Sequence, residues 1–416
     1  MHNSNKTIWI VNFHTAPPDL ALNPRYISLI KYLKDYGYNI IVFSSSYLRR
    51  FNRDLLQENE IYKEVEYKGI KYVHIKSQKY KNNGLKRMLS IVQFSFRFNS
   101  IINKFDKPDI IYHNLHVPFD VPIYFGARRL KVKYIAEVWD LWPEFFHIVG
   151  LVKKNNPLLK IAYKIERWIY KKSDAIVFTM KGAIDYIKSK KWNLESGGDL
   201  DLNKMHYITN GIDLSDFDIN KANHEKNDDI LNNDSLFKVV YVGTINKANN
   251  VIQILEAANI LKYDKSIVFL LYGDGTQRDE LEKYCYENNI TNVVFKDKYV
   301  PFKMLPSILS KCSLFLMNYQ KKFGIYGVSP GKLPLYLASG KPIISNVKVN
   351  HCIIEERNLG LSKDITSPDE YAEAILHIKN LPVQQYEEIC ERVKEVAREY
   401  DYKYLAEKLH KVFQTL

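Results

Sequence analysis

Short apolar runs alternate with helix-length segments along the whole chain, and this rhythm constrains the fold more than any other feature. In the first half, the runs Ile8–Phe13, Asn39–Ser44 and Lys133–Val138 alternate with longer amphipathic stretches such as Pro157–Lys172. Near-continuous apolar runs are typical of parallel strands buried on both faces, and parallel strands need connections of helix length. The first half is therefore predicted to be a doubly wound α/β domain.

A second series of the same kind begins at Phe237, after the Asp- and Asn-rich residues 214–236, whose weak periodicity predicts a linker. At 416 residues the chain is too long for one ordinary core. We therefore predict an α/β fold of two Rossmann-like, doubly wound domains facing a cleft, because open sheets bind ligands outside the carboxyl ends of their strands. The predicted parts are an N-terminal domain (1–213), the linker (214–236), a C-terminal domain (237–395) and a helix (396–416) that returns to the N-terminal domain.

The formal net charge of +13 lies in the first half of the chain. Residues 1–200 carry about 33 Lys and Arg against about 18 Asp and Glu, whereas the rest is close to neutral. Such a field favours an anionic partner, which could be nucleic acid, phospholipid or a diphosphate, and a merely solvated basic face is the plain alternative.

Several classes of protein are disfavoured. The apolar runs are far shorter than a membrane span, and the N-terminus lacks the features of a signal peptide, so a cytoplasmic location is expected. No His or Cys residues have the spacing of a metal site, and we expect neither a metal nor another cofactor. The isolated cysteines are expected to be reduced core thiols: Cys285, Cys312, Cys352 and Cys390.

Glycine turns follow several of the predicted strands. Val242-Gly243-Thr244 ends one strand and opens a helix, whose free N–H groups could face an anion, with Lys247 nearby. An ordinary βα loop with a solvated Lys is the plain alternative there, and Leu271–Gly275 is another strand-to-helix glycine turn, of a kind too common to identify a nucleotide. Neither turn identifies a ligand alone.

The stretch Phe323–Lys332 is the most informative, because its glycines allow close backbone approach and Ser329 can cap a following helix. It predicts a helix start that receives a phosphate. Pro334 leaves that start uncertain by one turn, since a helix beginning at Pro330 would place Pro334 beyond its first turn.

Taken in order, these motifs resemble glycosyltransferase family 4, in the fucosaminyltransferase-like branch that builds bacterial surface polysaccharides. The resemblance covers nearly the whole chain. Its motifs are Asn12–His14, Asn23–Tyr26, Glu137–Glu144, Ile165–Arg167, Asn210–Asp213, Gly273–Gly275 and Ala338–Pro342.

The resemblance implies a GT-B fold in which the C-terminal domain holds a nucleotide-sugar donor and the N-terminal domain holds the acceptor, with retention of anomeric configuration and no bound metal. Phosphate-facing N–H groups and Lys would stabilise the departing diphosphate. The implied donor-binding residues are Gly243, Thr244, Lys247, Gly273, Gly275, Lys298, Tyr299, Val300, Tyr326, Gly327, Ser329, Lys332 and Leu335.

The chain departs from the family at three positions. The usual pair of carboxylates, eight positions apart, maps onto Gly327 and Leu335, and Trp139 stands where many members have a His near the sugar. The polar candidates that remain for catalysis are Asp140, Glu137 and His116, each of which could equally be a strand-end residue with a structural role.

Residues 84–108 combine apolar side chains, such as Leu85, Leu89 and Phe96, with basic ones, such as Lys86 and Arg97. A basic amphipathic helix can lie on an anionic membrane, and packing into the core explains the apolar positions equally well. Both interpretations stay open at this stage.

The leading hypothesis is an enzyme that transfers a hexose or N-acetylated amino sugar from a UDP-linked donor to a lipid-linked glycan, peripheral at the inner face of the cell membrane. Capsule, O-antigen or exopolysaccharide synthesis would use it. A sugar-nucleotide epimerase of the same fold and a non-catalytic sugar-nucleotide-binding subunit are the alternatives. No nucleic-acid recognition motif accompanies the charge. The sugar, nucleotide, acceptor, linkage and oligomeric state are not specified by the residues.

Overall fold

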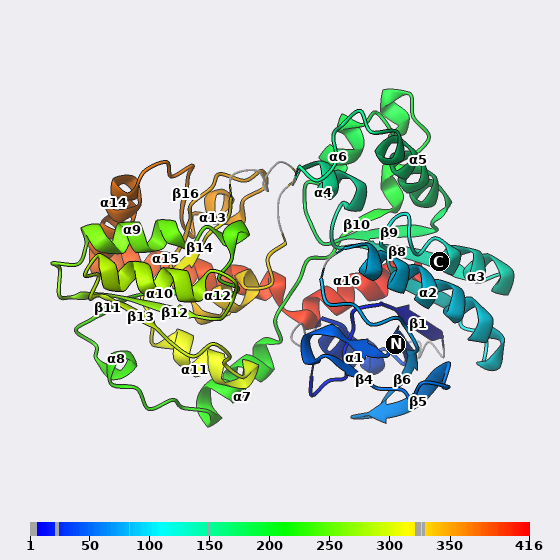
Figure 1. Cartoon of the computed structure of the whole chain (residues 1–416), viewed down its shortest axis with the longest axis horizontal. Helices are drawn as coiled ribbons and strands as arrows, with labels where there is room; N and C mark the ends of the chain where they lie inside the picture. Colours follow the sequence, from blue (N-terminus) through cyan, green and yellow to red (C-terminus); the bar gives the residue numbers. More distant parts are fainter. Residues whose placement is uncertain (1–5, 21–24, 83, 149, 321–325, 327–328) are drawn as a thin grey trace. The chain divides into compact units, whose positions relative to one another are not determined.

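The computed structural model describes residues 6–20, 25–82, 84–148, 150–320, 326 and 329–416. The chain forms two compact units, each described here by itself (Figure 1). Unit 1 comprises Met1–Thr209 together with Leu405–Leu416, and unit 2 comprises Asn210–Tyr404.

Unit 1 is built on an eight-stranded sheet in the order β10-β9-β8-β7-β1-β2-β6-β5, parallel except where β5 pairs with β6. Strand order reverses between β1 and β7, and in such sheets ligands bind outside the carboxyl ends of the two strands that flank the reversal. The strands are β1 (Thr7–Val11), β2 (Asn39–Ser45), β5 (Tyr62–Tyr67), β6 (Ile70–Ile75), β7 (Ile110–Asn114), β8 (Lys133–Val138), β9 (Ala175–Phe178) and β10 (Met205–Tyr207).

Helices connect these strands. A small antiparallel hairpin of β3 (Tyr47–Leu48) and β4 (Arg53–Asp54) follows β2, and in the C-terminal helix α16 His410 stacks on Tyr36 with ring centroids 4.0 Å apart. The helices of unit 1 are α1 (Arg25–Asp35), α2 (Leu85–Ile101), α3 (Pro122–Leu130), α4 (Trp142–Ile148), α5 (Pro157–Lys172), α6 (Ala183–Ser189) and most of α16 (Tyr402–Gln414).

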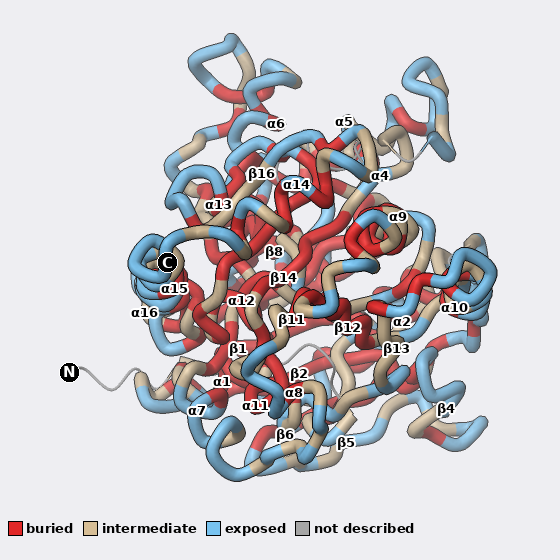
Figure 2. Tube along the Cα trace, turned by 90° about the vertical axis from the view of Figure 1, so that its left-hand side faces the viewer, coloured by how far each residue is buried: buried red, intermediate tan, exposed pale blue. Residues whose placement is uncertain are grey.

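Unit 2 has a six-stranded sheet in the order β13-β12-β11-β14-β15-β16, parallel throughout, with its reversal between β11 and β14. Side chains of each strand alternate between two apolar clusters, so that Val239 and Tyr241 belong to one core and Val240 to the other. Figure 2 shows the strands of both sheets largely buried. The strands are β11 (Phe237–Val242), β12 (Ile267–Tyr272), β13 (Val293–Phe295), β14 (Leu314–Met317), β15 (Ile343–Ser345) and β16 (Gly360–Ser362). The predicted GT-B arrangement of two Rossmann-like, parallel α/β domains is confirmed.

Residues 214–236, predicted as a linker, contain two short helices, α7 (Leu214–Asn223) and α8 (Asp229–Asn232). Asp213 and Asp228 begin them by accepting hydrogen bonds from backbone N–H groups of the first turn. Phe217 and Leu231 then pack into the core of unit 2. The remaining helices are α9 (Ile252–Ile260), α10 (Arg278–Glu287), α11 (Leu305–Ser310), α12 (Leu333–Ser339), α13 (Ile353–Glu356), α14 (Pro368–Lys379) and α15 (Val383–Ala397).

Two further details differ from or sharpen the sequence prediction. Helix α12 begins at Leu333, which places Pro334 in its first turn, where a missing N–H costs no hydrogen bond. The charged C-terminal stretch is two helices, α15 and α16, separated at Tyr400 and Asp401. All four cysteines are free and buried, and all of them lie in unit 2.

Candidate functional site

In unit 1, the three polar candidates predicted from the sequence lie where β7 and β8 end. His116 follows β7, and its Nδ1 lies 3.0 Å from Oδ2 of Asp120, which also accepts the backbone N–H of His116. The same Oδ2 is 3.2 Å from Nε2 of His113. Burial alone would raise the pKa of Asp120, but the two histidines hold it well below its usual range. Asp120 therefore fixes the ring of His116 as a buried anion.

Asp140 is exposed to solvent just after β8. The surrounding protein raises the pKa of its carboxyl by desolvation, while the charges of His116 and Arg87 act in the opposite direction. On the other side of His116, the ring of His14 packs edge-on at 5.1 Å between centroids. The structure thus brings together two predicted candidates, Asp140 and His116, with the unpredicted His14 and Arg87.

Glu137 has a different environment. Its side chain is fully buried, with an ion pair of 2.7 Å to Arg25 and hydrogen bonds from the hydroxyls of Tyr26 and Tyr112. Arg25 also donates to the backbone carbonyls of Ile208 and Thr209. Donors from three residues contact this carboxylate in the interior, so Glu137 holds α1, β7 and β8 together. A catalytic role for Glu137 stays a prediction from the sequence.

A recess of about 580 Å³ opens at the same edge of unit 1. Trp139, at the position where the family often has a His, lies in its wall and stacks on Tyr26 with ring centroids 5.7 Å apart. Sequence reasoning did not find this recess, because the hairpin residues that form one wall, Arg49 among them, carry no motif.

In unit 2, the loops after β11 and β12 approach each other through glycine. Gly243 has φ +152° and Gly273 has φ +132°, and a Cβ on Gly273 would lie 1.9 Å from the carbonyl oxygen of Gly243. Only glycine permits both this backbone conformation and this contact. Arg278, which sequence reasoning missed, stabilises the arrangement by donating to the carbonyls of Gly273 and Lys296.

Lys332 is the distinctive group of this loop cluster. Its Nζ is buried, has no hydrogen-bond partner in the described part of the chain, and lies 4.1 Å from the ring centroid of Tyr241. A Cβ built on Gly243 would lie 3.1 Å from that Nζ. Burial lowers the pKa of Lys332 to about 7. An ammonium held without a partner beside a glycine turn is poised to receive an anion.

Helix α12 holds Lys332 in position. The hydroxyl of Tyr336 accepts the backbone N–H of Val242 at 2.8 Å, and its ring stacks on Phe315 at 4.5 Å. Leu335, at one of the family's carboxylate positions, is buried in the apolar core. The structure therefore gives Leu335 a packing role and leaves no carboxylate at this position.

The other predicted donor residues are more scattered. Thr244 and Lys247 are exposed at the turn after β11, Lys298, Tyr299 and Val300 follow the outermost strand β13, and Gly275 supports the β12 loop by contacting Ile245. Ser329 accepts hydrogen bonds from Asn210 at 3.1 Å. Tyr326 is half-buried, and Gly327 lies outside the described residues.

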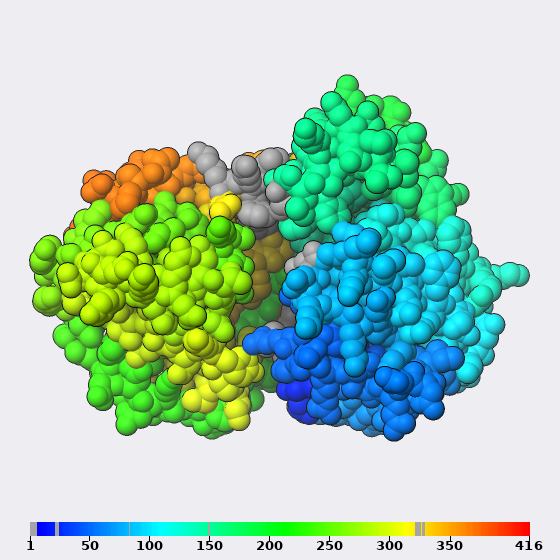
Figure 3. All heavy atoms as spheres, in the orientation of Figure 1, coloured from blue at the N-terminus to red at the C-terminus, as the bar shows by residue number. Residues whose placement is uncertain are grey.

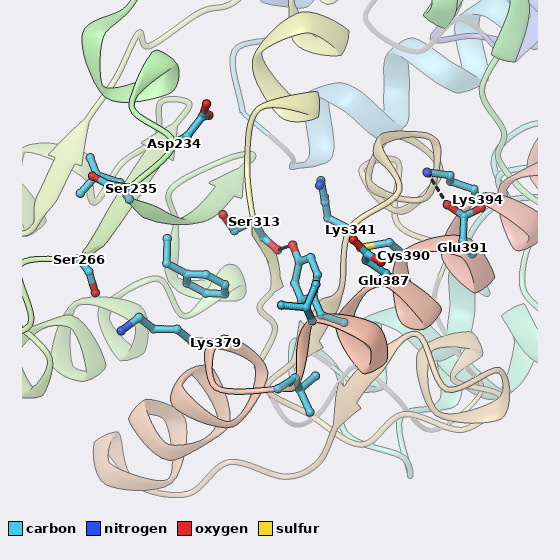
Figure 4. Close-up of a pocket in the computed structure, with 15 residues that line it drawn as sticks. Asp234, Ser235, Ser266, Ser313, Lys341, Lys379, Glu387, Cys390, Glu391 and Lys394 are labelled. Carbon is cyan, nitrogen blue, oxygen red and sulfur yellow. Dashed lines mark hydrogen bonds and ion pairs between the residues drawn. The ribbon is translucent and has the colours of Figure 1, made fainter.

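A separate hollow of about 780 Å³ in unit 2 is lined by residues at the amino ends of the strands, such as Phe237 and Ser313 (Figure 4). It carries none of the predicted site residues. Two of its lysines are already paired, Lys379 with Asp264 at 2.8 Å and Lys394 with Glu391 at 2.7 Å. Rossmann-type ligands bind outside the carboxyl ends of the strands, where the donor loops lie, whereas this hollow lies at the amino ends.

The described residues lack two kinds of feature. No group of three or more His, Cys, Asp and Glu side chains there has the arrangement of a metal site. Within the same residues, no helix has both the length and the apolar character needed to cross a bilayer.

Comparison with known protein families decides the class. The model of Glycosyltransferase Family 4 matches residues 25–216, and that of Glycosyl transferases group 1 matches residues 223–400, so the two successive matches correspond to the two sheets. The chain is a GT-B glycosyltransferase. No curated protein sequence gives a significant match to this glycosyltransferase.

Solved structures resemble this glycosyltransferase in fold. Sucrose-phosphate synthase from Thermosynechococcus elongatus is 15% identical with a TM-score of 0.71, over 99% of this chain and 98% of its own. The E. coli trehalose-6-phosphate structure bound with UDP-2-fluoro glucose is 12% identical with a TM-score of 0.74, over 99% of both chains. Anabaena Alr3699/HepE in complex with UDP and glucose is 14% identical with a TM-score of 0.65, over 99% of this chain and 100% of its own.

Proposed function

We propose that this glycosyltransferase moves a sugar, with retention of configuration, from a UDP-linked hexose or N-acetylated amino sugar to a lipid-linked glycan at the inner face of the cell membrane. Its place would be in capsule, O-antigen or exopolysaccharide synthesis, in the fucosaminyltransferase-like branch that the sequence motifs resemble. The observation that carries the donor half is the buried ammonium of Lys332 beside Gly243, which has no hydrogen-bond partner among the described residues.

A diphosphate explains both features of that cluster. Bound at the glycine turn, it would accept hydrogen bonds from backbone N–H groups of the loop and form an ion pair with Lys332. The ion pair would offset the free-energy cost of burying that ammonium. The same groups would stabilise the negative charge that develops on the departing diphosphate. UDP and a UDP-sugar analogue are bound by two of the structurally similar proteins, which supports uridine as the first nucleotide to test.

The acceptor half is proposed for unit 1. Asp140, solvent-exposed and close to His116, is the best-placed group to orient or accept the proton of an attacking hydroxyl, and Asp120 holds His116 in position. A raised pKa brings a carboxyl closer to the range in which proton transfer is efficient.

The proposed contact with the membrane is the surface formed by α2 to α5. Helix α2 buries one face, with Ile91, Phe94 and Phe98, and leaves Leu85 72% and Phe96 61% exposed. Core packing therefore accounts for only part of its apolar side chains. In Figure 3 the light-blue and cyan atoms of α2 and α3 form part of the face toward the viewer.

The neighbouring helices extend this surface, and ring contacts between Phe125 of α3 and Trp168 of α5 join them. Leu151 and Leu158 are exposed by 71% and 73%, among lysines of the segment 153–164. Exposed apolar side chains mixed with Lys and Arg favour the surface of an anionic membrane over a neutral one.

Calorimetric titration tests the donor proposal. We expect UDP-sugars to bind the wild type, with unchanged affinity in EDTA, and to bind Lys332→Met at least about tenfold more weakly, because a charge-assisted hydrogen bond is lost. Binding that needs a divalent metal, or equal binding by Lys332→Met, would contradict it.

Sedimentation with vesicles tests the membrane proposal. We expect binding to vesicles that contain phosphatidylglycerol, weakening as salt rises, and little binding to neutral vesicles. The variant Leu85→Ser/Phe96→Ser should bind less, whereas Tyr286→Ser/Val383→Ser, two highly exposed positions of unit 2, should bind as the wild type does. Equal partition of both variants would refute this surface.

A further inference from the structure

The recess in unit 1 combines an aromatic floor with a basic rim. Phe13, Tyr26, Tyr47 and Tyr80 line it and are at most 5% exposed, so they form a largely buried aromatic wall. The basic residue types that line it are Arg49, Arg50, Arg87 and His14, and no carboxylate is among the described lining residues.

The hairpin and the first turn of α2 bring these arginines together from distant parts of the sequence. Arg49 and Arg50 lie in the turn between β3 and β4, which Tyr47 secures by donating from its hydroxyl to Asn52 at 2.9 Å. Arg87 comes from α2, where its guanidinium lies 5.2 Å from the ring centroid of Trp142 and 3.0 Å from Nε2 of His14.

Like charges are crowded at this rim. Desolvation by the surrounding protein and the charges of His116, Arg87 and Arg49 lower the pKa of His14, whose Nε2 faces Arg87. Burial and Arg49 also lower the pKa of Arg87, while Tyr80 and Asp140 act against that. Arg49 and Arg87 are therefore close enough to act on each other across this rim.

A bound anion would relieve the crowding. Guanidinium groups match phosphate oxygens in geometry. Several guanidinium groups at one recess favour a phosphate or diphosphate, with a charge of about −2, over a carboxylate with a single charge. Aromatic walls beside them suit the face of a sugar ring or an isoprenoid chain.

We propose that this recess binds the acceptor through a phosphate or diphosphate group, so that the acceptor is charged close to the hydroxyl that is glycosylated. This assignment rests on the proposed acceptor role of unit 1. It places the anion at Arg49 and Arg87 and directs the rest of the acceptor toward Asp140, which acts electrostatically on Arg87. A free sugar phosphate and a sugar carried on a lipid diphosphate share this chemistry.

Calorimetry on the full chain tests the proposal with two probes. One is glucose 6-phosphate in solution, and the other is undecaprenyl diphosphate in phosphatidylcholine vesicles. The variant Arg49→Gln/Arg87→Gln removes two charges of the rim. Its matched control, Arg53→Gln/Lys79→Gln, removes two exposed charges close by in sequence that do not line the recess. Methyl glucoside serves as the neutral probe.

We expect at least one phosphate probe to bind the wild type and the control alike, and the rim variant about tenfold or more weakly, with little binding of methyl glucoside. The probe that binds identifies a soluble or a lipid-borne source. Equal affinity in the rim variant and the control, or no binding of either phosphate probe at millimolar concentration, would overturn the proposal. Titrating Lys332→Met with the phosphate probes and with UDP-sugars distinguishes the proposed donor site from the proposed acceptor-phosphate site. Unchanged UDP-sugar binding by this variant would count against the donor site and would not affect the conclusion about the recess.

Discussion

Replacing Lys332 with Met should make the protein more stable and its donor binding weaker. The ammonium is buried beside Tyr241 with no hydrogen-bond partner in the part of the chain that the structure describes, so the folded chain tolerates a charge that the unfolded chain exposes to water. Methionine has a similar shape and packs well against an aromatic ring. The substitution therefore removes the desolvation cost while it removes the charge that a diphosphate would meet.

The size of the gain follows from the pKa. Folding lowers the pKa of Lys332 from 10.5 to about 7, and each tenfold change in proton affinity is worth about 1.4 kcal/mol. At pH 7 the lysine therefore costs about 4 kcal/mol. Between pH 7 and 10.5 the unfolded chain binds more protons than the folded one, so the wild-type free energy of unfolding rises with pH, by up to about 1.4 kcal/mol per pH unit.

Chemical unfolding at pH 7 and pH 9 checks this, with unit 2 followed by hydrogen exchange of the amides of β11 and α12. Lys332→Met should have a larger free energy of unfolding than the wild type at pH 7. Between pH 7 and pH 9 its free energy of unfolding should rise less than that of the wild type. All five tryptophans lie in unit 1, so their fluorescence gives an internal reference that should not change. The exposed Lys247→Met is the matched control, expected within about 0.5 kcal/mol of the wild type. A less stable Lys332→Met, with an unchanged pH slope, would refute the reasoning.

Three other substitutions test the site. Leu335→Glu should lower both the melting temperature and donor affinity, because its carboxylate would be buried in the core, whereas the exposed Leu158→Glu should change neither; tighter donor binding would show that a ribose pocket survives here. Glu137→Gln should cost about 3–5 kcal/mol in urea unfolding followed by tryptophan fluorescence, against at most about 1 kcal/mol for Glu64→Gln in an exposed pair. Asp140→Asn should lower kcat about 100-fold or more with donor affinity unchanged, and an unchanged kcat would remove it from the reaction.

The sequence predicted the parallel strands well and the polar edges poorly. Apolar runs such as Ile267–Tyr272 predict a strand buried on both faces, whereas β5 (YKEVEY) is a half-exposed edge strand with no such run. Residues 214–236 were interpreted as a linker because their apolar positions are sparse. Asp213, directly before that stretch, and Asp228, within it, cap α7 and α8, and tertiary packing of Phe217 and Leu231 supplies the rest.

The candidate site divides in the same way. Lys332 was found because it follows a glycine-rich motif, but its burial depends on Tyr241 and Gly243, about 90 positions earlier. Glu137 belongs to the most distinctive motif, and only the convergence of Arg25, Tyr26 and Tyr112 reveals that it holds α1, β7 and β8 together. The basic rim could not be predicted, because Arg49 and Arg87 become neighbours only when the hairpin and α2 are in place.

The buried cysteines make this protein convenient for site-specific labelling. Burial raises the pKa of Cys285 to about 11 and that of Cys312 to about 12, and Cys390 is shifted in the same direction, so little reactive thiolate is present at neutral pH. A maleimide dye should therefore modify the native wild type slowly. A single cysteine introduced at an exposed position of α2, such as Leu89→Cys, would carry the dye alone and report environment changes in unit 1 without first removing any natural thiol.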